Sequence, residues 1–248
     1  MSGNSMRKQR QAERNWSPPP IEPQTRKQAT YLDLLERLPC LIVEGPAGTG
    51  KTYLACAWAG QQLLARNTDA VILTRPVVGV GGKTMGFLPG NEARKMGPWA
   101  RPLVEAFKRN MSAKKYDEAA AAGQIRVEPL EYIRGLTFDR TIMIIDEAQN
   151  TTPKEMKAFL TRIGDESRVI ICGDPGQSDI DPVNNGLAWA SAAVARGLVP
   201  DTGAVTFTSA DVVRSALCRA WGEAFDTMEA EQREKADLTA GLRRTLGG

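Results

Sequence analysis

The chain has 248 residues, of which 42% are hydrophobic and 25% are charged, which is enough for one sizeable core and short for two full domains. Its net charge of +3 is too small to demand a polyanionic partner, although it permits one. No apolar run approaches the roughly twenty residues that a membrane span needs, and the amino terminus lacks the apolar segment of a signal peptide, so we expect a soluble, cytoplasmic protein without membrane contact.

Residues 1–20 are polar and basic and end in SPPP, a composition that predicts a disordered basic arm. Short apolar stretches then alternate with helical patterns over 21–226, which predicts one α/β domain with a mostly parallel sheet and helices on both faces. The expected helices include 28–37 and 51–66, and the expected strands are 40–44, 70–74, 125–128, 141–145, 168–172 and 204–208. The remaining residues, 227–248, form a charged tail for which we expect a loosely attached helix.

The four cysteines, Cys40, Cys56, Cys172 and Cys218, are widely separated and lie in apolar segments. None of them forms a C-x-x-C pair, so the pattern favours buried, reduced thiols over a disulfide framework or a zinc ribbon.

The segment GPAGTGKT matches the phosphate-binding pattern G-x-x-x-x-G-K-[ST] and lies between an expected strand and an expected helix. In such a loop, backbone N–H groups surround the phosphates, Lys51 reaches the β and γ phosphates, and the hydroxyl of Thr52 ligates magnesium. The segment therefore predicts binding of ATP with Mg²⁺ by Gly45, Pro46, Ala47, Gly48, Thr49, Gly50, Lys51 and Thr52.

Two carboxylates follow the apolar strand in TIMIIDEAQN, at the strand end where parallel sheets bind ligands. Asp146 is the expected magnesium ligand of a Walker B motif, and Glu147 is the expected general base for the attacking water. The chain has no histidine, so a carboxylate has to take this role. A charge pair that stabilises a helix N-terminus is the alternative interpretation.

A third apolar strand ends in GDPGQ, which contains Asp174 and Gln177. A glutamine at this edge would hydrogen-bond the γ phosphate or the attacking water. A turn built on Asp-Pro-Gly is the competing interpretation.

Together these motifs resemble the PhoH family of P-loop ATPases, which are similar to the first RecA-like domain of superfamily 1 helicases. The resemblance runs from about Pro23 to Phe225 and depends on the P-loop and on the segments RPVVGVGGKTMGFLPG, PLEYIRGLTF, IIDEAQNTTPKEMKAFLTRIG, GDPGQSDI and DVVRS. Ser215 departs from the family pattern, which has histidine directly after the arginine of DVVRS. This difference leaves the role of the DVVRS segment open.

The resemblance also implies roles for residues outside the P-loop. Gln28 matches the glutamine that reads the adenine edge, with a surface helix glutamine as the alternative. Arg75, Lys83 and Arg134 match positions that contact the nucleic-acid backbone. For Arg75 the alternative is that it faces the nucleotide, since it directly follows a strand. A structural salt bridge is the alternative for Arg134.

The chain has no room for the second RecA-like domain that completes the ATP site of a superfamily 1 helicase. We therefore expect a homo-oligomer, such as a hexameric ring, that acts on RNA or single-stranded nucleic acid. Arg214, expected at the start of a helix, would neutralise charge on the γ phosphate, and we favour the neighbouring subunit's site over its own. Arg162 is the reserve candidate, and pairing with Asp211 is the structural alternative for Arg214.

Two other functions remain open at this stage. A P-loop nucleotide or deoxynucleoside kinase is the chief alternative, because type II thymidine kinases also combine a P-loop with a D-E-A-Q run; those enzymes carry a zinc ribbon, for which this sequence has no paired cysteines. The other is an ATP-binding regulatory protein with negligible turnover, and Glu147 argues against it.

Overall fold

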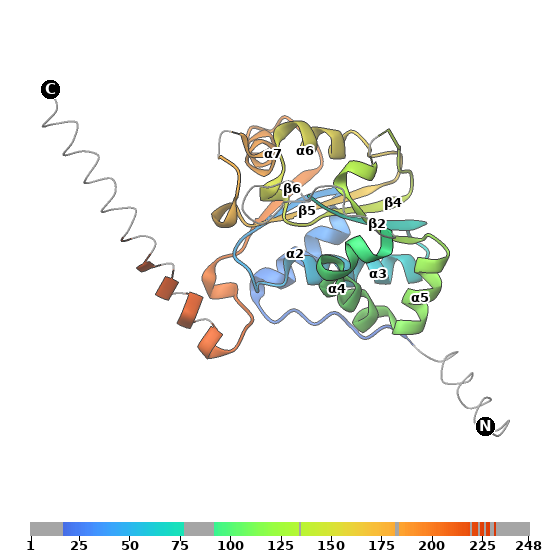
Figure 1. Ribbon diagram of the computed structural model, residues 1–248, viewed down its shortest axis with the longest axis horizontal. Coiled ribbons are helices and arrows are strands. Elements are labelled where there is room, and N and C mark those ends of the chain that lie inside the picture. Colours follow the sequence, from blue (N-terminus) through green and yellow to red (C-terminus); the bar gives the residue numbers. More distant parts are fainter. Residues whose placement is uncertain are drawn as a thin grey trace, which may run out of the picture.

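A six-stranded parallel sheet forms the centre of the computed structural model (Figure 1). The structure describes residues 17–76, 92–133, 135–181, 184–218, 220–222, 224–225, 227–228 and 231, with the backbone alone for 92–99. The strands are β1 (Cys40–Glu44), β2 (Ala70–Arg75), β3 (Ile125–Pro129), β4 (Thr141–Ile145), β5 (Arg168–Gly173) and β6 (Thr202–Thr206). The helices are α2 (Arg26–Arg37), α3 (Lys51–Leu64), α4 (Glu92–Met111), α5 (Ala113–Ala121), α6 (Pro153–Leu160) and α7 (Gly186–Ala195).

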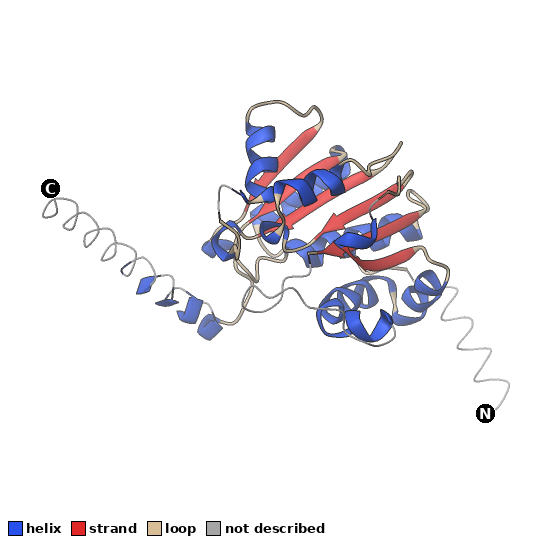
Figure 2. Cartoon of the chain, turned by 45° about the horizontal axis from the view of Figure 1, so that its top comes forward, coloured by secondary structure: helices blue, strands red, loops and turns tan. Residues whose placement is uncertain are grey.

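The central strands are apolar on both sides, which is why the sheet needs cover on both faces. All five residues of β4 are buried, and the middle residues of β1 and β2 are buried as well. Helices α2, α3, α4 and α5 cover one face and α6 and α7 cover the other, as Figures 1 and 2 show. The predicted α/β class with helices on both faces is confirmed, and every pairing between the described strands is parallel.

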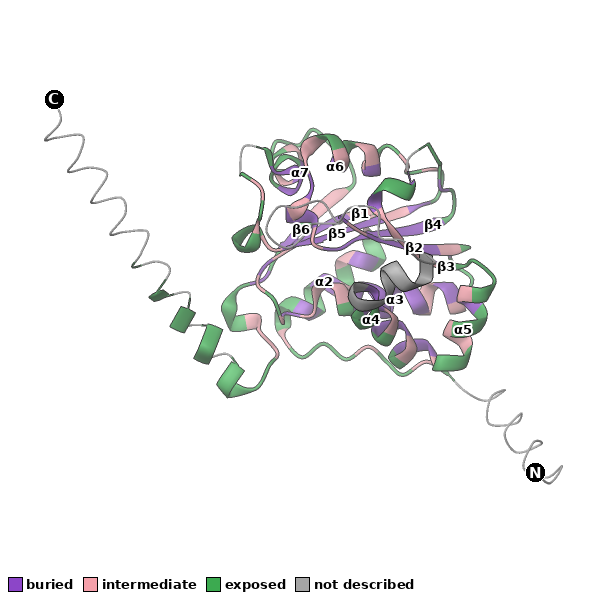
Figure 3. Cartoon of the chain, viewed as in Figure 1, coloured by how far each residue is buried: buried purple, intermediate pink, exposed green. Residues whose placement is uncertain are grey.

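Alternate side chains of the four inner strands, β1, β2, β4 and β5, enter two separate apolar cores. In β1, Leu41 and Val43 pack with the core that contains Phe107 of α4, whereas Ile42 packs with the core that contains Phe159 of α6. This alternation follows from the two-residue period of a strand. Figure 3 shows the buried residues concentrated in the sheet and on the helix faces turned toward it.

The strand order is β3-β2-β4-β5-β1-β6, so β5 lies between β1 and β4. Because the strands are parallel, the segments that follow β1, β2, β4 and β5 all leave the same edge of the sheet. The phosphate-binding loop, the Asp-Glu pair and the GDPGQ turn therefore meet at one place.

The predicted strands are all present, but the bounds of the last one, β6, differ from the prediction. Residues 204–208 were expected there, but β6 pairs with β1 from Thr202 to Thr206. Thr208 instead precedes a short 3₁₀ turn over Ser209–Asp211, and its backbone N–H and its hydroxyl both donate to the carboxylate of Asp211. The helix expected over 51–66 ends at Leu64, and the backbone φ of Arg66 is +62°.

The four cysteines are free thiols, but their predicted burial is only partly confirmed. Cys56 and Cys172 are buried, Cys40 is half-buried and Cys218 is exposed. The prediction is therefore wrong for Cys218, because the apolar segment around it does not pack into either core.

None of the helices in the described part of the chain combines the length and the apolar character that a membrane span requires. The structure describes four residues of the predicted arm, 17–20, and three of the predicted tail, 227, 228 and 231. The boundaries of the arm, the domain and the tail stay predictions.

Candidate active site

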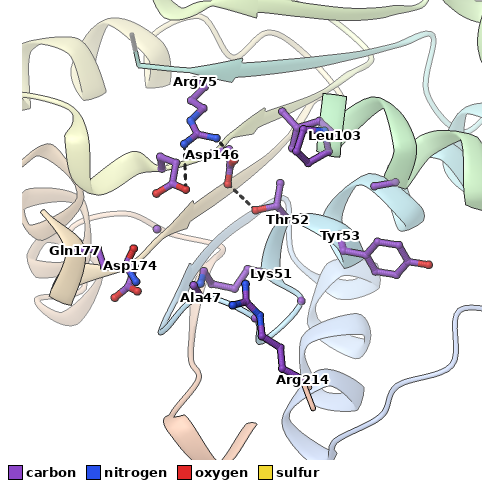
Figure 4. A pocket seen from close by; sticks show the side chains of 16 residues that line it. Ala47, Lys51, Thr52, Tyr53, Arg75, Leu103, Asp146, Asp174, Gln177 and Arg214 are labelled. Carbon is purple, nitrogen blue, oxygen red and sulfur yellow. Dashed lines mark hydrogen bonds and ion pairs between the residues drawn. The ribbon is translucent and has the colours of Figure 1, made fainter. Parts of the chain in front are cut away.

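A cavity of about 390 Å³ lies at the carboxyl ends of the central strands (Figure 4). Its walls come from the phosphate-binding loop, the ends of β2, β4 and β5, helix α4 and the segment after β6. The lining residues are Ala47, Gly48, Gly50, Lys51, Thr52, Tyr53, Arg75, Pro102, Leu103, Ala106, Asp146, Glu147, Gly173, Asp174, Gln177 and Arg214. Most of the residues predicted for catalysis, phosphate binding and magnesium binding thus surround one cavity.

The phosphate-binding loop has the glycine conformations that the sequence pattern requires. Gly48 and Gly50 have φ angles of +86° and +85°, which side chains other than glycine rarely adopt. Lys51 is the first residue of α3, and its Nζ donates to the carbonyl oxygens of Gly45 and Pro46 at 2.5 and 3.0 Å. The lysine is therefore held within the loop, at the N-terminus of a helix, where anions bind favourably.

Thr52 and Asp146 meet although they are far apart in the sequence. The Thr52 hydroxyl donates to Oδ1 of Asp146 at 2.5 Å. Burial raises the pKa of the Asp146 carboxyl, while the hydrogen bond from Thr52 and the charge of Arg75 act in the opposite direction. A hydroxyl and a carboxylate are hard oxygen ligands of the kind Mg²⁺ prefers, so these two residues fit the predicted metal.

Glu147 is held in an uncommon backbone conformation next to Asp146. Its φ and ψ are 53° and 41°, in the left-handed region, which a non-glycine residue adopts at some cost. Its Oε2 accepts a hydrogen bond from Nε2 of Gln149 at 2.6 Å, and its Oε1 lies 3.3 Å from Nη2 of Arg75. Both carboxylate oxygens are thus oriented by neighbouring side chains.

Gln149 is a site residue that the sequence analysis missed. It is 1% exposed, and its Oε1 accepts the backbone N–H of Asp174 at 2.9 Å. The side chain therefore connects the segment after β4 with the segment after β5. Its position in DEAQN, two residues after Glu147, is the sequence feature that could have predicted its presence in the site.

Arg75 lines the cavity, which agrees with the alternative that it faces the nucleotide, and its contact with the nucleic-acid backbone stays a prediction. The guanidinium points toward Asp146, with Nη1 3.6 Å from Oδ2, and its other nitrogen reaches Glu147 (Figure 4). The reason is its position as the last residue of β2, beside β4 in the sheet. Lys83 and Arg134 lie outside the described residues, so their nucleic-acid contacts stay predictions.

The GDPGQ segment forms the turn that its Asp-Pro-Gly alternative predicted, whereas the contact of Gln177 with the γ phosphate or the attacking water stays a prediction. Asp174 accepts the backbone N–H of Gly176 and begins a short 3₁₀ turn over Pro175–Gln177, as the Asp-Pro-Gly alternative predicted. Gln177 nevertheless lines the cavity. Burial raises the pKa of Asp174, which also faces the cavity.

Arg214 lies over the phosphate-binding loop of its own chain. The backbone N–H of Val213 donates to the carbonyl oxygen of Gly48 at 2.9 Å, and a Cβ added to Gly48 would lie 2.5 Å from Nε of Arg214. Arg214 precedes the helical residues that begin at position 216. Arg214 thus lies beside the phosphate-binding loop of its own chain, and its action in a neighbour's site stays a prediction.

The chain matches the family model described as "PhoH-like protein" over residues 20–226. It is 39% identical over 213 residues to a PhoH-like protein of Synechocystis, covering 84% of this chain and 63% of that protein. It is also 40% identical over 207 residues to a PhoH-like protein of Bacillus subtilis, covering 83% of this chain and 64% of that protein.

The chain belongs to the PhoH-like family. It is 37% identical over 203 residues to Protein PhoH of Escherichia coli K12, covering 81% of this chain and 56% of that protein. This PhoH-like chain thus spans less than two thirds of the length of these relatives.

Two solved helicases were also matched. Pif1 helicase from Candida albicans is 20% identical with a TM-score of 0.38, covering 76% of this chain and 41% of that one. UvsW helicase from bacteriophage T4 is 11% identical with a TM-score of 0.45, covering 82% of this chain and 67% of that one.

Gln28 of this PhoH-like chain is buried behind the phosphate-binding loop and does not line the cavity. Its Nε2 donates to the carbonyl oxygen of Thr49 at 3.0 Å, and its Oε1 accepts the backbone N–H of Gln24 at 2.7 Å. The surface-glutamine alternative is therefore wrong. Adenine reading by Gln28 stays a prediction.

Arg162, the reserve arginine, does not line the cavity. It lies after the end of α6, and its Nη1 donates to the carbonyl oxygen of Leu136 at 3.2 Å. The structural alternative for Arg214 is also wrong, because no Arg214–Asp211 ion pair forms between these two described residues and the Asp211 carboxylate is engaged by Thr208.

The sequence analysis missed the apolar wall of the cavity. Pro102, Leu103 and Ala106 contribute it from α4, and Tyr53 lies on α3 immediately after Thr52. The α4 residues carried no local signal, because only the packing of α4 against α3 brings them to the phosphate-binding loop.

Proposed function

We propose that this PhoH-like chain binds ATP with Mg²⁺ in the cavity and hydrolyses it to ADP and phosphate by water attack on the γ phosphorus. The observation that carries the proposal is the hydrogen bond between Thr52 and Asp146, beside Glu147 and within the cavity that Lys51 lines. Two oxygen groups that could ligate a metal thus lie near a carboxylate and the lysine of the phosphate-binding loop, which supports the proposal.

Each residue has a separate task in the proposed reaction. Lys51 and the backbone N–H groups of the loop bind the phosphates, and Thr52 and Asp146 would hold Mg²⁺, which supplies positive charge to the phosphate oxygens when bound. Glu147 orients the attacking water and accepts its proton on a carboxylate oxygen.

Two further side chains complete the proposed site. Gln177 hydrogen-bonds the γ phosphate or the attacking water, and Arg214 neutralises the charge that develops on the phosphate oxygens. The lining of the cavity by both side chains supports these roles.

We further propose that hydrolysis serves a task on RNA or another single-stranded nucleic acid, carried out by a homo-oligomer. Family membership supports this part, together with the basic residues Lys83 and Arg134 of the matched motifs. A nucleotide kinase is not favoured, because the family match extends over nearly the whole domain.

The test is phosphate release from ATP with single-stranded RNA, with single-stranded DNA and without polymer. Lys51→Ala should abolish productive binding or turnover, whereas Glu147→Gln should retain binding of a fluorescent ATP analogue and lose about 10²–10⁴-fold in rate. Near-normal turnover in Glu147→Gln would remove Glu147 from the mechanism. Thymidine phosphorylation in a parallel assay would support the kinase alternative instead.

The nucleic-acid part has its own test. Lys83→Ala should weaken RNA binding and reduce its salt dependence while the affinity for ATP stays unchanged, because phosphate contacts release counterions. Unchanged RNA binding would contradict the assignment of Lys83. Mass measurement with a non-hydrolysable nucleotide tests the oligomer.

A further inference from the structure

Arg75 forms a bridge between the two carboxylates of the site. Its Nη1 lies 3.6 Å from Oδ2 of Asp146, and its Nη2 lies 3.3 Å from Oε1 of Glu147. It comes from β2, whereas both carboxylates follow β4, so the bridge joins two neighbouring strands (Figure 4). The family resemblance implied that Arg75 contacts nucleic acid. In the structure its ion-pair partners are Asp146 and Glu147.

Two neighbouring side chains, Arg75 and Gln149, contact the Glu147 carboxylate. Asp146 and Glu147 are adjacent carboxylates whose negative charges repel, and the backbone of Glu147 is in the left-handed region. Such conformations persist where the surroundings hold them. Nε2 of Gln149 donates to one carboxylate oxygen of Glu147 at 2.6 Å. Arg75 is the partner of the other oxygen, so removing Arg75 would leave that oxygen without this contact.

Folding stability gives little reason for an arginine at this position. About a third of the side chain is exposed, and ion pairs at such exposure add little to stability because water competes with them. The orientation of a general base, by contrast, affects rate strongly, since a displacement of about 1 Å can lower it about 100-fold.

We propose that Arg75 is a positioning residue for hydrolysis, which holds the Glu147 carboxylate in the orientation that the attacking water requires. The inference depends on the proposed ATP hydrolysis and adds to it the side chain that orients its base. Arg75 acts through Glu147, so its removal should lower kcat while the affinity for the nucleotide stays nearly constant.

The test compares Arg75→Ala with Arg140→Ala. Arg140 is a matched control, because it also bridges two carboxylates, Asp69 and Glu166, yet lies outside the cavity. Arg75→Ala should lower kcat about 10- to 100-fold, with KM for ATP and the affinity for a fluorescent ADP within threefold of the wild type. Arg75→Lys should recover part of the rate, since an ammonium replaces the charge without the planar fork.

A double variant separates positioning from a general structural effect. In the Glu147→Gln background, adding Arg75→Ala should lower the single-turnover rate less than threefold, because the group that Arg75 orients is already absent. A kcat equal to that of Arg140→Ala, or a full additional loss in the Glu147→Gln background, would overturn the proposal. Lost RNA affinity at normal kcat would overturn it too, in favour of polymer contact.

A crystal structure of Arg75→Ala gives a readout that is independent of turnover. We expect the Glu147 carboxylate to leave its present position while the Thr52–Asp146 hydrogen bond remains. An unmoved Glu147 carboxylate would overturn the proposal even if the wild type hydrolysed no ATP. Absence of turnover in the wild type would overturn the proposed function, and the crystal structure would still decide whether Arg75 holds the Glu147 carboxylate in place.

Discussion

Replacing Gln28 by leucine would leave the carbonyl oxygen of Thr49 without the hydrogen bond that it now receives. Thr49 has 0% exposure, so water cannot readily take the place of the lost amide. Gln24, the other partner, is an exposed residue whose N–H can be rehydrated. The cost should therefore come mainly from the Thr49 carbonyl.

A buried polar group left unpaired costs about 1–3 kcal/mol of stability. For a protein of this size, each 1 kcal/mol shifts the melting temperature by about 2–4 °C. Gln28→Leu should therefore lower the melting temperature by about 2–12 °C without any nucleotide present. Since Thr49 belongs to the phosphate-binding loop, the affinities for ATP and GTP should fall together.

Circular dichroism melting without nucleotide measures the first effect, and competition of ATP and GTP against a fluorescent nucleotide measures the second. Gln24→Ala is the matched control, because it removes an exposed glutamine side chain one turn earlier and keeps the backbone N–H. An unchanged melting temperature, combined with a selective loss of affinity for ATP over GTP, would refute the reasoning and support adenine reading by Gln28.

Because Arg214 lies over the phosphate-binding loop of its own chain, mixing the inactive variants Arg214→Ala and Glu147→Gln should restore no ATPase activity. Recovery toward a quarter of the wild-type rate, after proven subunit exchange, would instead place the arginine in a neighbour's site. Burial raises the pKa of Cys172 to about 12, so its contribution to stability is complete below about pH 8.5, the pKa of an unfolded thiol, and is lost as the pH rises toward 12. Above about pH 8.5, the free energy of unfolding of the wild type, measured in urea, should therefore fall by up to about 1.4 kcal/mol per pH unit because of this group. Cys172→Ala should reduce that decline, and equal slopes in both proteins would contradict the assignment.

The sequence by itself determined the strands and the conformation of the P-loop, because both depend on residues that are close in sequence. The run TIMII is apolar throughout, and only a strand buried on both faces uses such a run in a parallel sheet. The P-loop likewise carries its glycines, Lys51 and Thr52 within one short segment. The same locality explains why Asp146 and Glu147 were found, since they directly follow a recognisable strand.

Tertiary structure alone decided what Arg75, Gln28 and Arg214 contact. Thr74 of β2 pairs with Ile145 of β4, so the next residue of each strand, Arg75 and Asp146, meets at the same edge. No periodicity within either segment specifies which strands become neighbours, since that depends on how all six pack between two layers of helices. The partner of each of these polar side chains comes from a distant segment, and its identity is settled only when the sheet order brings the two segments together.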